Sequence, residues 1–275
     1  MPRQLKYDIQ NKLKTYFPVF FELLNNNPFD WFEVDECFGR KADEYMARQK
    51  KTDGTFPIQA SLLIIIRRAV IEKEPDAIRL FEYMRNLFEQ LADRTTAEEK
   101  KLITPALFGL LTNVDMKYLN FVGELSVLTL LKMRLPLTLL ETERPLLLND
   151  PDGTKIDFHF LNRNSCREYL TEMVNIHLTQ KNTFSDEYIE RLLDQKIRGK
   201  LLATGIDKNK TFLLYPVLWG GWDKIKVVAD YYRDKNPQFE NTSIPVGFVP
   251  FSDEHGQPVY KFGTIDTIFV NSTAQ

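Results

Sequence analysis

Two acidic residues in neighbouring stretches of the sequence have the types and the spacing that a metal site requires. Residues 155–161 alternate between polar and apolar side chains, which indicates a β-strand that carries Asp157. The polar residues 162–167 predict a hairpin loop, and residues 168–178 predict a second strand that carries Glu172. The two carboxylates are therefore expected on adjacent antiparallel strands.

The register of this hairpin decides whether the two side chains meet. If Leu161 pairs with Glu168, Asp157 lies directly opposite Glu172, with the two Cβ atoms about 5 Å apart on one face of the sheet. Two carboxylates at that separation repel each other unless a positive charge lies between them. Mg²⁺ is commonly held by one or two carboxylates and keeps water ligands for phosphate oxygens, so a divalent cation satisfies this pair.

A purely structural explanation is also open for the same residues. Glu172 lies between Leu170 and Val174 on an otherwise apolar strand face, and a charge placed there needs a partner. A metal ion is one such partner. The other is Lys155, which the same register puts opposite Val174, so that Glu172 and Lys155 would form an ion pair.

The surrounding sequence predicts an α/β fold, with a mixed central sheet flanked by helices and with an α-helical N-terminal region. Residues 1–114 have apolar side chains at helical spacing and form the predicted helical region, while residues 115–275 form the predicted α/β domain. The elements expected in the second part are helices at 116–133, 185–203 and 222–233, and strands at 137–141, 155–161, 168–178, 211–218, 244–250 and 259–270.

The strings Gly153-Thr-Lys-Ile-Asp157-Phe and Tyr169-Leu-Thr-Glu172-Met-Val174 resemble the core of the PD-(D/E)XK, or restriction-endonuclease-like, superfamily. The expected order of helix, three strands, helix and strand is also that family's core order. The resemblance implies nuclease activity with Mg²⁺ or Mn²⁺ as the cofactor. It implies that Asp157 and Glu172 bind the metal, together with Glu124 on the preceding helix.

The chain departs from the family pattern at one position. The family's lysine follows the second acidic residue by two positions, where this sequence has Val174. In the family that lysine helps to activate the attacking water. Lys155 is the favoured replacement because the hairpin register puts it on the same face, and Lys196 and Lys200 on the following helix are alternatives.

Two functions follow from this pattern. The first is metal-dependent hydrolysis of phosphodiester bonds in nucleic acid, with Asp157, Glu172 and Lys155 as catalytic residues and DNA as the partner. The second is a catalytically inactive nuclease-fold protein that serves as a binding or assembly module, with a protein partner at the helical N-terminal region. A homodimer is compatible with either function.

Composition limits the choice further. The formal net charge of −2 argues against strong non-specific DNA binding by the chain as a whole. Two cysteines are too few for a disulfide framework or a paired zinc site, which favours a reducing compartment. The longest apolar run, residues 62–66, is far shorter than the roughly 20 residues that a membrane-spanning helix needs. We therefore expect a cytoplasmic protein without membrane contact.

Overall fold

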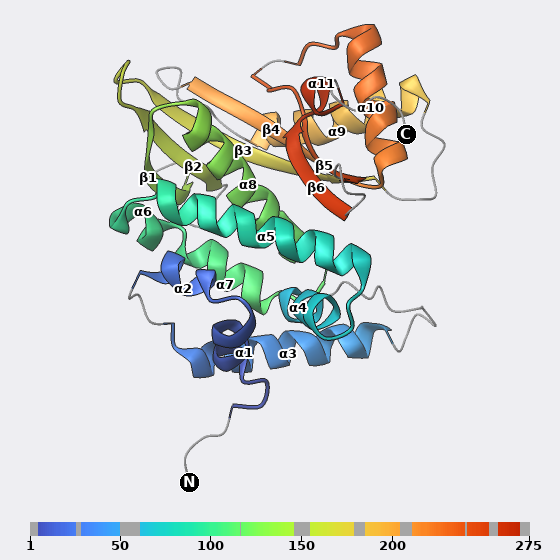
Figure 1. The fold of residues 1–275 in the computed structure, drawn as a ribbon. Coiled ribbons are helices and arrows are strands. Elements are labelled where there is room, and N and C mark those ends of the chain that lie inside the picture. Colours follow the sequence, from blue (N-terminus) through green and yellow to red (C-terminus); the bar gives the residue numbers. More distant parts are fainter. Residues whose placement is uncertain are drawn as a thin grey trace. The chain divides into compact units, whose positions relative to one another are not determined.

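The protein was analysed as a computed structural model, shown in Figure 1. The structure describes residues 5–25, 29–49, 61–115, 117–145, 155–178, 185–203, 211–239, 241–252 and 258–269. The chain divides into two compact units, Met1–Thr129 and Leu130–Gln275, and each is described by itself. The division falls inside a helix, further along the chain than residue 114, and the domain limits expected from the sequence stay a prediction.

The first unit is helical in its described parts. Its helices are α1 (Ile9–Tyr16), α2 (Val19–Leu24), α3 (Trp31–Gln49), α4 (Leu62–Val70), α5 (Pro75–Arg94), α6 (Ala97–Leu102), α7 (Thr104–Thr112) and α8 (Tyr118–Arg134), the last of which continues into the second unit.

Phenylalanine side chains hold several of these helices together. Phe17, which follows α1, lies 5.1 Å from Phe88 of α5 between ring centroids, and Phe20 of α2 stacks on the same Phe88 at 5.8 Å. All three are essentially buried. Burial of each such side chain contributes about 1.5–3 kcal/mol, so the heptad-like apolar stripe of α5 anchors the neighbouring helices.

The second unit is a mixed α/β structure built on a six-stranded sheet in the described ranges. The strands lie in the order β1-β2-β3-β4-β5-β6, so chain order and spatial order agree (Figure 1). Neighbours β1–β2, β2–β3 and β5–β6 are antiparallel, whereas β3–β4 and β4–β5 are parallel. The elements are β1 (Leu137–Pro145), β2 (Lys155–Asn162), β3 (Glu168–His177), α9 (Asp186–Ala203), β4 (Thr211–Trp219), α10 (Trp222–Lys235), β5 (Val246–Ser252), β6 (Pro258–Thr264) and α11 (Ile265–Ile268).

The two parallel connections explain where the core of this unit lies. Parallel strands need a crossover, and α9 and α10 supply it between β3, β4 and β5. Leu214 and Leu218 of β4 are fully buried and belong to one apolar cluster with Ile189 of α9 and Ile225 of α10. The near-continuous apolar sequence of β4 therefore predicted a central strand correctly.

Most elements expected from the sequence are present, with three differences. Helix α7 was not expected, β1 is longer than the expected strand at 137–141, and the expected strand at 259–270 ends at Thr264 and continues as α11. The turn-forming residues 149–153 and 254–256, and Gly205 after the expected helix at 185–203, lie outside the described residues. None of the helices in the described ranges combines the length and the apolar character that a membrane crossing demands.

Candidate functional site

The register of the β2–β3 hairpin is the one expected from the sequence. Leu161 pairs with Glu168, and regular pairing continues to Phe158 and Thr171. The loop between the strands is closed by Asn162, whose side-chain oxygen accepts hydrogen bonds from the backbone N–H groups of residues 164 and 165 at 2.9 and 3.2 Å. The loop chemistry thus fixes the register, and the register places Asp157 and Glu172 at the next position along the hairpin.

Asp157 and Glu172 do lie together, and they bind backbone groups of each other's strands. The backbone N–H of Asp157 donates to Oε2 of Glu172 at 3.2 Å. The backbone N–H of Met173 donates to Oδ2 of Asp157 at 2.6 Å. Regular strand pairing stops one position earlier, so these two bonds take over from it. Both carboxylates therefore have a structural task where the two strands separate.

Glu172 is only 2% exposed. Side chains alternate along a strand, so Glu172 shares its face with Leu170 and Val174, and both of these belong to the apolar cluster that packs on α9 and α10. Its neighbour in the parallel register is the fully buried Leu214. A carboxylate in such surroundings must accept hydrogen bonds, and the N–H of Asp157 supplies one of them.

The residues expected to complete the site are placed differently. Val174 is buried in the apolar cluster, at the position where the resemblance implies a lysine. Lys155 is exposed and lies opposite Pro145 of β1, while the expected Lys155–Val174 pair falls beyond the regular β2–β3 pairing. Glu124 is half-buried on the part of α8 that belongs to the first unit.

Asp157 and Glu172 are only two of the three acidic ligands that the resemblance implies for a metal site. Within the described ranges, no three His, Cys, Asp or Glu side chains are grouped so that they could hold a metal ion. Two carboxylates can bind Mg²⁺ if water and substrate supply the other ligands, but here one oxygen of each accepts a backbone hydrogen bond. The donor set therefore does not fit the three-carboxylate site that the resemblance implies. Whether Glu124, Asp157, Glu172 and Lys155 act as site residues stays a prediction.

A second polar cluster lies on β1, β2 and β3, and the sequence did not predict the partners of its histidine. His159 of β2 is 4% exposed, with Nε2 at 2.8 Å from Oε2 of Glu168. Its Nδ1 lies 2.8 Å from Nη1 of Arg144 and 3.3 Å from Oε2 of Glu141. Because a guanidinium only donates hydrogen bonds, Nδ1 accepts from Arg144, and Nε2 carries the hydrogen that is donated to Glu168. The polar histidine in an alternating strand was the available signal.

At the other end of β3, aromatic rings follow one another across the sheet. His177 stacks on Trp219 of β4 with ring centroids 6.2 Å apart, and Trp219 stacks on Phe248 of β5 at 4.0 Å. The indole N–H of Trp219 donates to Oδ1 of Asn175 at 2.8 Å. Burial, and secondarily the positive charge of Lys196, lower the pKa of His177. The positive charge of Lys196 therefore influences the protonation of His177 at this end of β3.

The fold and the site together define a mixed α/β protein with a carboxylate-bearing hairpin. No family model and no curated protein matches the chain. Among solved structures, Pyrococcus furiosus SfsA in complex with Ca²⁺ is similar to the chain, with a TM-score of 0.23 and 9% sequence identity. The match covers 54% of this chain and 64% of that protein, so the chain spans less than two thirds of its length. A similarity of this strength identifies neither fold nor function.

Proposed function

We propose that this protein is a non-catalytic binding module, in which Asp157 and Glu172 hold a sheet together and do not catalyse phosphodiester hydrolysis. The observation that carries the proposal is the pair of hydrogen bonds from the backbone of residues 157 and 173 to these carboxylates. Carboxylates that accept backbone N–H groups where strand pairing ends are stabilising elements in their own right.

The position of Val174 supports the same function. A lysine that activates water must reach the reacting phosphate, whereas Val174 packs into the apolar cluster on α9 and α10. Lys155, the favoured replacement, is exposed at the start of β2. The nuclease mechanism needs a lysine that activates water, and position 174 of this hairpin does not provide one.

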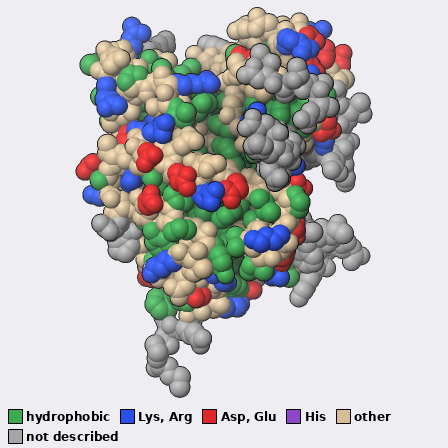
Figure 2. Space-filling model, viewed as in Figure 1, with side chains coloured by type: hydrophobic (Ala, Val, Ile, Leu, Met, Phe, Trp, Pro, Cys, Tyr) green, Lys and Arg blue, Asp and Glu red, His purple; other side chains and the backbone are tan. Residues whose placement is uncertain are grey.

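The distribution of charge favours a protein or small-molecule partner over nucleic acid. On the face shown in Figure 2, acidic and basic side chains are interspersed over the helices of the first unit. The formal net charge is −2. Phosphate backbones are bound by concentrated positive charge, so this surface is poorly suited to them. We place the protein-binding surface on the first unit, whose α3 exposes Phe32 and Met46.

The test compares two substitutions of Asp157. A structural role predicts a different loss of stability for each, whereas a metal-binding role predicts that both abolish metal binding. Asp157→Asn keeps an oxygen that can accept the Met173 N–H, whereas Asp157→Ala removes it. We expect Asp157→Ala to lower the free energy of unfolding by about 1–3 kcal/mol, and Asp157→Asn to lower it clearly less, because an unsatisfied buried N–H is costly. Denaturant unfolding measures both, and Glu190→Gln on the exposed face of α9 is the matched control.

The same variants are then titrated with Mg²⁺ and Mn²⁺ by calorimetry and incubated with plasmid DNA and with RNA. We expect no saturable metal binding and no cleavage by the wild type. Saturable metal binding and cleavage that both Asp157→Asn and Asp157→Ala abolish, while Glu190→Gln retains them, would overturn the proposal.

That outcome would establish the second candidate, a Mg²⁺-dependent or Mn²⁺-dependent nuclease. The observation in its favour is that Asp157 and Glu172 meet on adjacent strands in the register expected from the sequence. The helix–strand–strand–strand–helix–strand order from α8 to β4 supports it as well. In this case Asp157 and Glu172 would hold the ion, and the ion would lower the pKa of the attacking water.

A further inference from the structure

A groove of about 640 Å³ lies on the first unit, between α3 and the residues that precede α1. Its lining on α3 includes Phe32, Asp35, Glu36, Arg40, Asp43 and Glu44. Residues at this spacing lie on one face of the helix, and the twelve positions from the first to the last extend about 18 Å along it. Residues 5–7 complete the lining. We call this surface the α3 groove.

The chain before α1 is held against α3 by a buried carboxylate. Asp35 is 5% exposed, and its two oxygens accept the backbone N–H groups of Lys6 at 2.8 Å and of Tyr7 at 3.0 Å. The ring of Tyr7 packs edge-on against Phe38, with the centroids 4.9 Å apart. It also lies so close to Gly39 that a Cβ atom there would come within 2.9 Å of the ring. The groove is therefore formed before a partner binds, which lowers the entropic cost of binding.

The α3 groove has an excess of negative charge. Two cations, Lys6 and Arg40, line it together with four carboxylates, at positions 35, 36, 43 and 44. Asp35 is buried under the chain before α1, whereas Asp43 and Glu44 are exposed. The excess of two negative charges in a concave surface attracts a cationic partner and repels an anionic one.

Apolar side chains lie at the other end of the groove. Phe32, near the start of α3, is 40% exposed, and Leu5 and Tyr7 in the same lining are half-buried. A partner that covers this apolar surface gains about 25 cal/mol per Å². Phe32 and the exposed carboxylates at 43 and 44 are about three helical turns apart, so a partner needs an apolar and a basic part at that separation.

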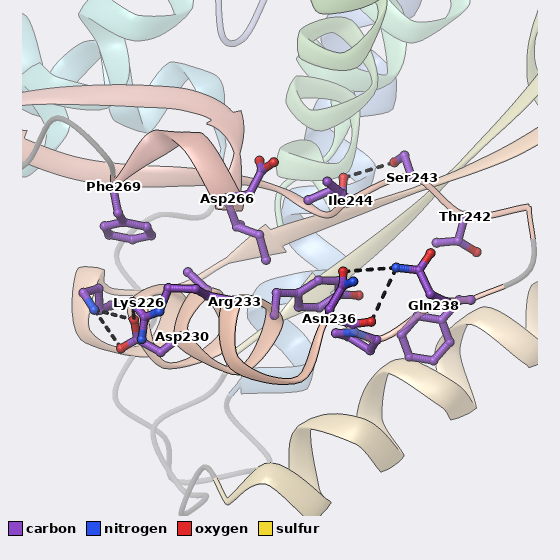
Figure 3. Close-up of a pocket in the computed structure, with 15 residues that line it drawn as sticks. Lys226, Asp230, Arg233, Asn236, Gln238, Thr242, Ser243, Ile244, Asp266 and Phe269 are labelled. Atoms are coloured by element: carbon purple, nitrogen blue, oxygen red, sulfur yellow. Dashed lines mark hydrogen bonds and ion pairs between the residues drawn. The ribbon is translucent and has the colours of Figure 1, made fainter.

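A cavity of about 750 Å³ beside α10 has a different lining. It is formed by α10, by the residues that follow it and by residues in and after α11 (Figure 3). Nζ of Lys226 lies 2.5 and 2.7 Å from the carboxylate oxygens of Asp230, and Nη1 of Arg233 lies 2.7 Å from the same carboxylate. Its aromatic side chains pack against the apolar cluster on α9 and α10, and they are Tyr232, Phe239 and Phe269. The features that suit a partner are therefore those of the α3 groove.

We infer that the α3 groove binds a basic amphipathic peptide segment of a partner protein, with lysine or arginine side chains beside Asp43 and Glu44 and an apolar side chain against Phe32. The inference rests on the proposed protein-binding surface of the first unit and names the chemistry of the partner. A partner helix of three turns is as long as the lining face of α3, so it can reach both ends of the groove. Phosphate groups are repelled by the same carboxylates.

The test selects peptides of about twelve residues, enough for three helical turns, from a random library displayed on phage, with the full chain as the target. We expect the enriched sequences to combine lysine or arginine with at least one large apolar residue. A synthetic peptide of the most enriched sequence is then titrated by fluorescence anisotropy. Its affinity should fall as the salt concentration rises, because the contacts with Asp43 and Glu44 are exposed to solvent.

Two variants of the groove are compared with two matched controls. The double substitution Asp43→Asn with Glu44→Gln, and separately Phe32→Ala, should each weaken peptide binding by about ten-fold or more. The double substitution Glu89→Gln with Asp93→Asn removes two exposed carboxylates from α5, and Ile71→Ala removes a side chain that is 62% exposed. Both controls should bind the peptide as the wild type does.

The unfolding temperature of each variant, measured without peptide, shows whether the fold is retained. The inference is overturned if no peptide is enriched, if the enriched peptides are acidic or uncharged, or if the variant at 43 and 44 binds with wild-type affinity. None of these outcomes bears on the hairpin, because metal binding and cleavage decide the role of Asp157 and Glu172. Asp157→Asn should accordingly leave the peptide affinity unchanged.

Discussion

The β2–β3 hairpin and the cavity beside α10 differ in whether their buried polar groups have hydrogen-bond partners within the chain. In the hairpin, the carboxylates of Asp157 and Glu172 accept backbone N–H groups, and the ring of His159 has partners at both nitrogens. In the cavity, the hydroxyl of Tyr232 is buried without a partner in the described chain.

This difference separates polar groups that stabilise the fold from a polar group that does not. A group whose hydrogen-bonding capacity is used internally stabilises the native state, and removing it costs stability. A hydroxyl that is buried and unpaired has lost its hydration without gaining a hydrogen bond, so its removal should cost little or no stability. Substitutions in the two regions should therefore differ in their effect on the free energy of unfolding.

The largest expected effect comes from Val174→Lys, which introduces the lysine that the PD-(D/E)XK pattern contains. Val174 packs against the cluster that includes Leu170 and Ile189, so an ammonium group there loses its hydration without gaining room. We expect the free energy of unfolding to fall by on the order of 3–5 kcal/mol in denaturant titrations.

Thr211→Lys at the exposed start of β4 is the control for this substitution, and it should change stability by less than about 0.5 kcal/mol. A stable Val174→Lys variant that gained Mg²⁺-dependent cleavage would show that the hairpin is a damaged active site. The hairpin carboxylates would then have a catalytic role and not only the structural role proposed for them.

The sequence predicted the hairpin well because its signals are local. Alternation along residues 155–161 and the polar loop at 162–167 fix both strands, and Asn162 closes the loop in the register that was expected. The partner of the carboxylates was not predictable. An Asp and a Glu at facing positions can bind a cation, and they can also accept backbone N–H groups. Which of the two occurs depends on where strand pairing ends, and the sequence does not show that point.

Other features left little trace in the sequence. Helix α7 is apolar around most of its circumference, with Leu107, Leu110 and Leu111 buried, so it has no polar stripe to reveal its period. The cavity is lined by α10, by residues 236–239 and 242–244 that follow it, and by residues in and after α11, which lies further along the chain beyond β5 and β6. Part of its wall, α11, lies in a stretch whose composition predicted a strand.

An intermediate effect is expected from His159→Leu, which keeps the size of the side chain and removes both ring nitrogens. Arg144 and Glu168 each lose a close partner, so we expect a loss of about 2 kcal/mol in the free energy of unfolding. Glu190→Gln on the exposed face of α9 is the control, and it should cost less than about 0.5 kcal/mol. If His159→Leu proves as stable as the wild type, the hairpin is not stabilised by its polar network.

The smallest effect on stability is expected from Asp230→Asn at the cavity. Asp230 is 34% exposed and pairs with Lys226 and Arg233 on the surface of α10, and such pairs contribute about 0–1 kcal/mol. Denaturant unfolding measures the change, and Glu190→Gln on α9 is the control, with an equally small expected effect. An Asp230→Asn variant that loses several kcal/mol instead would make this carboxylate a structural element like Glu172, and the two regions would no longer differ.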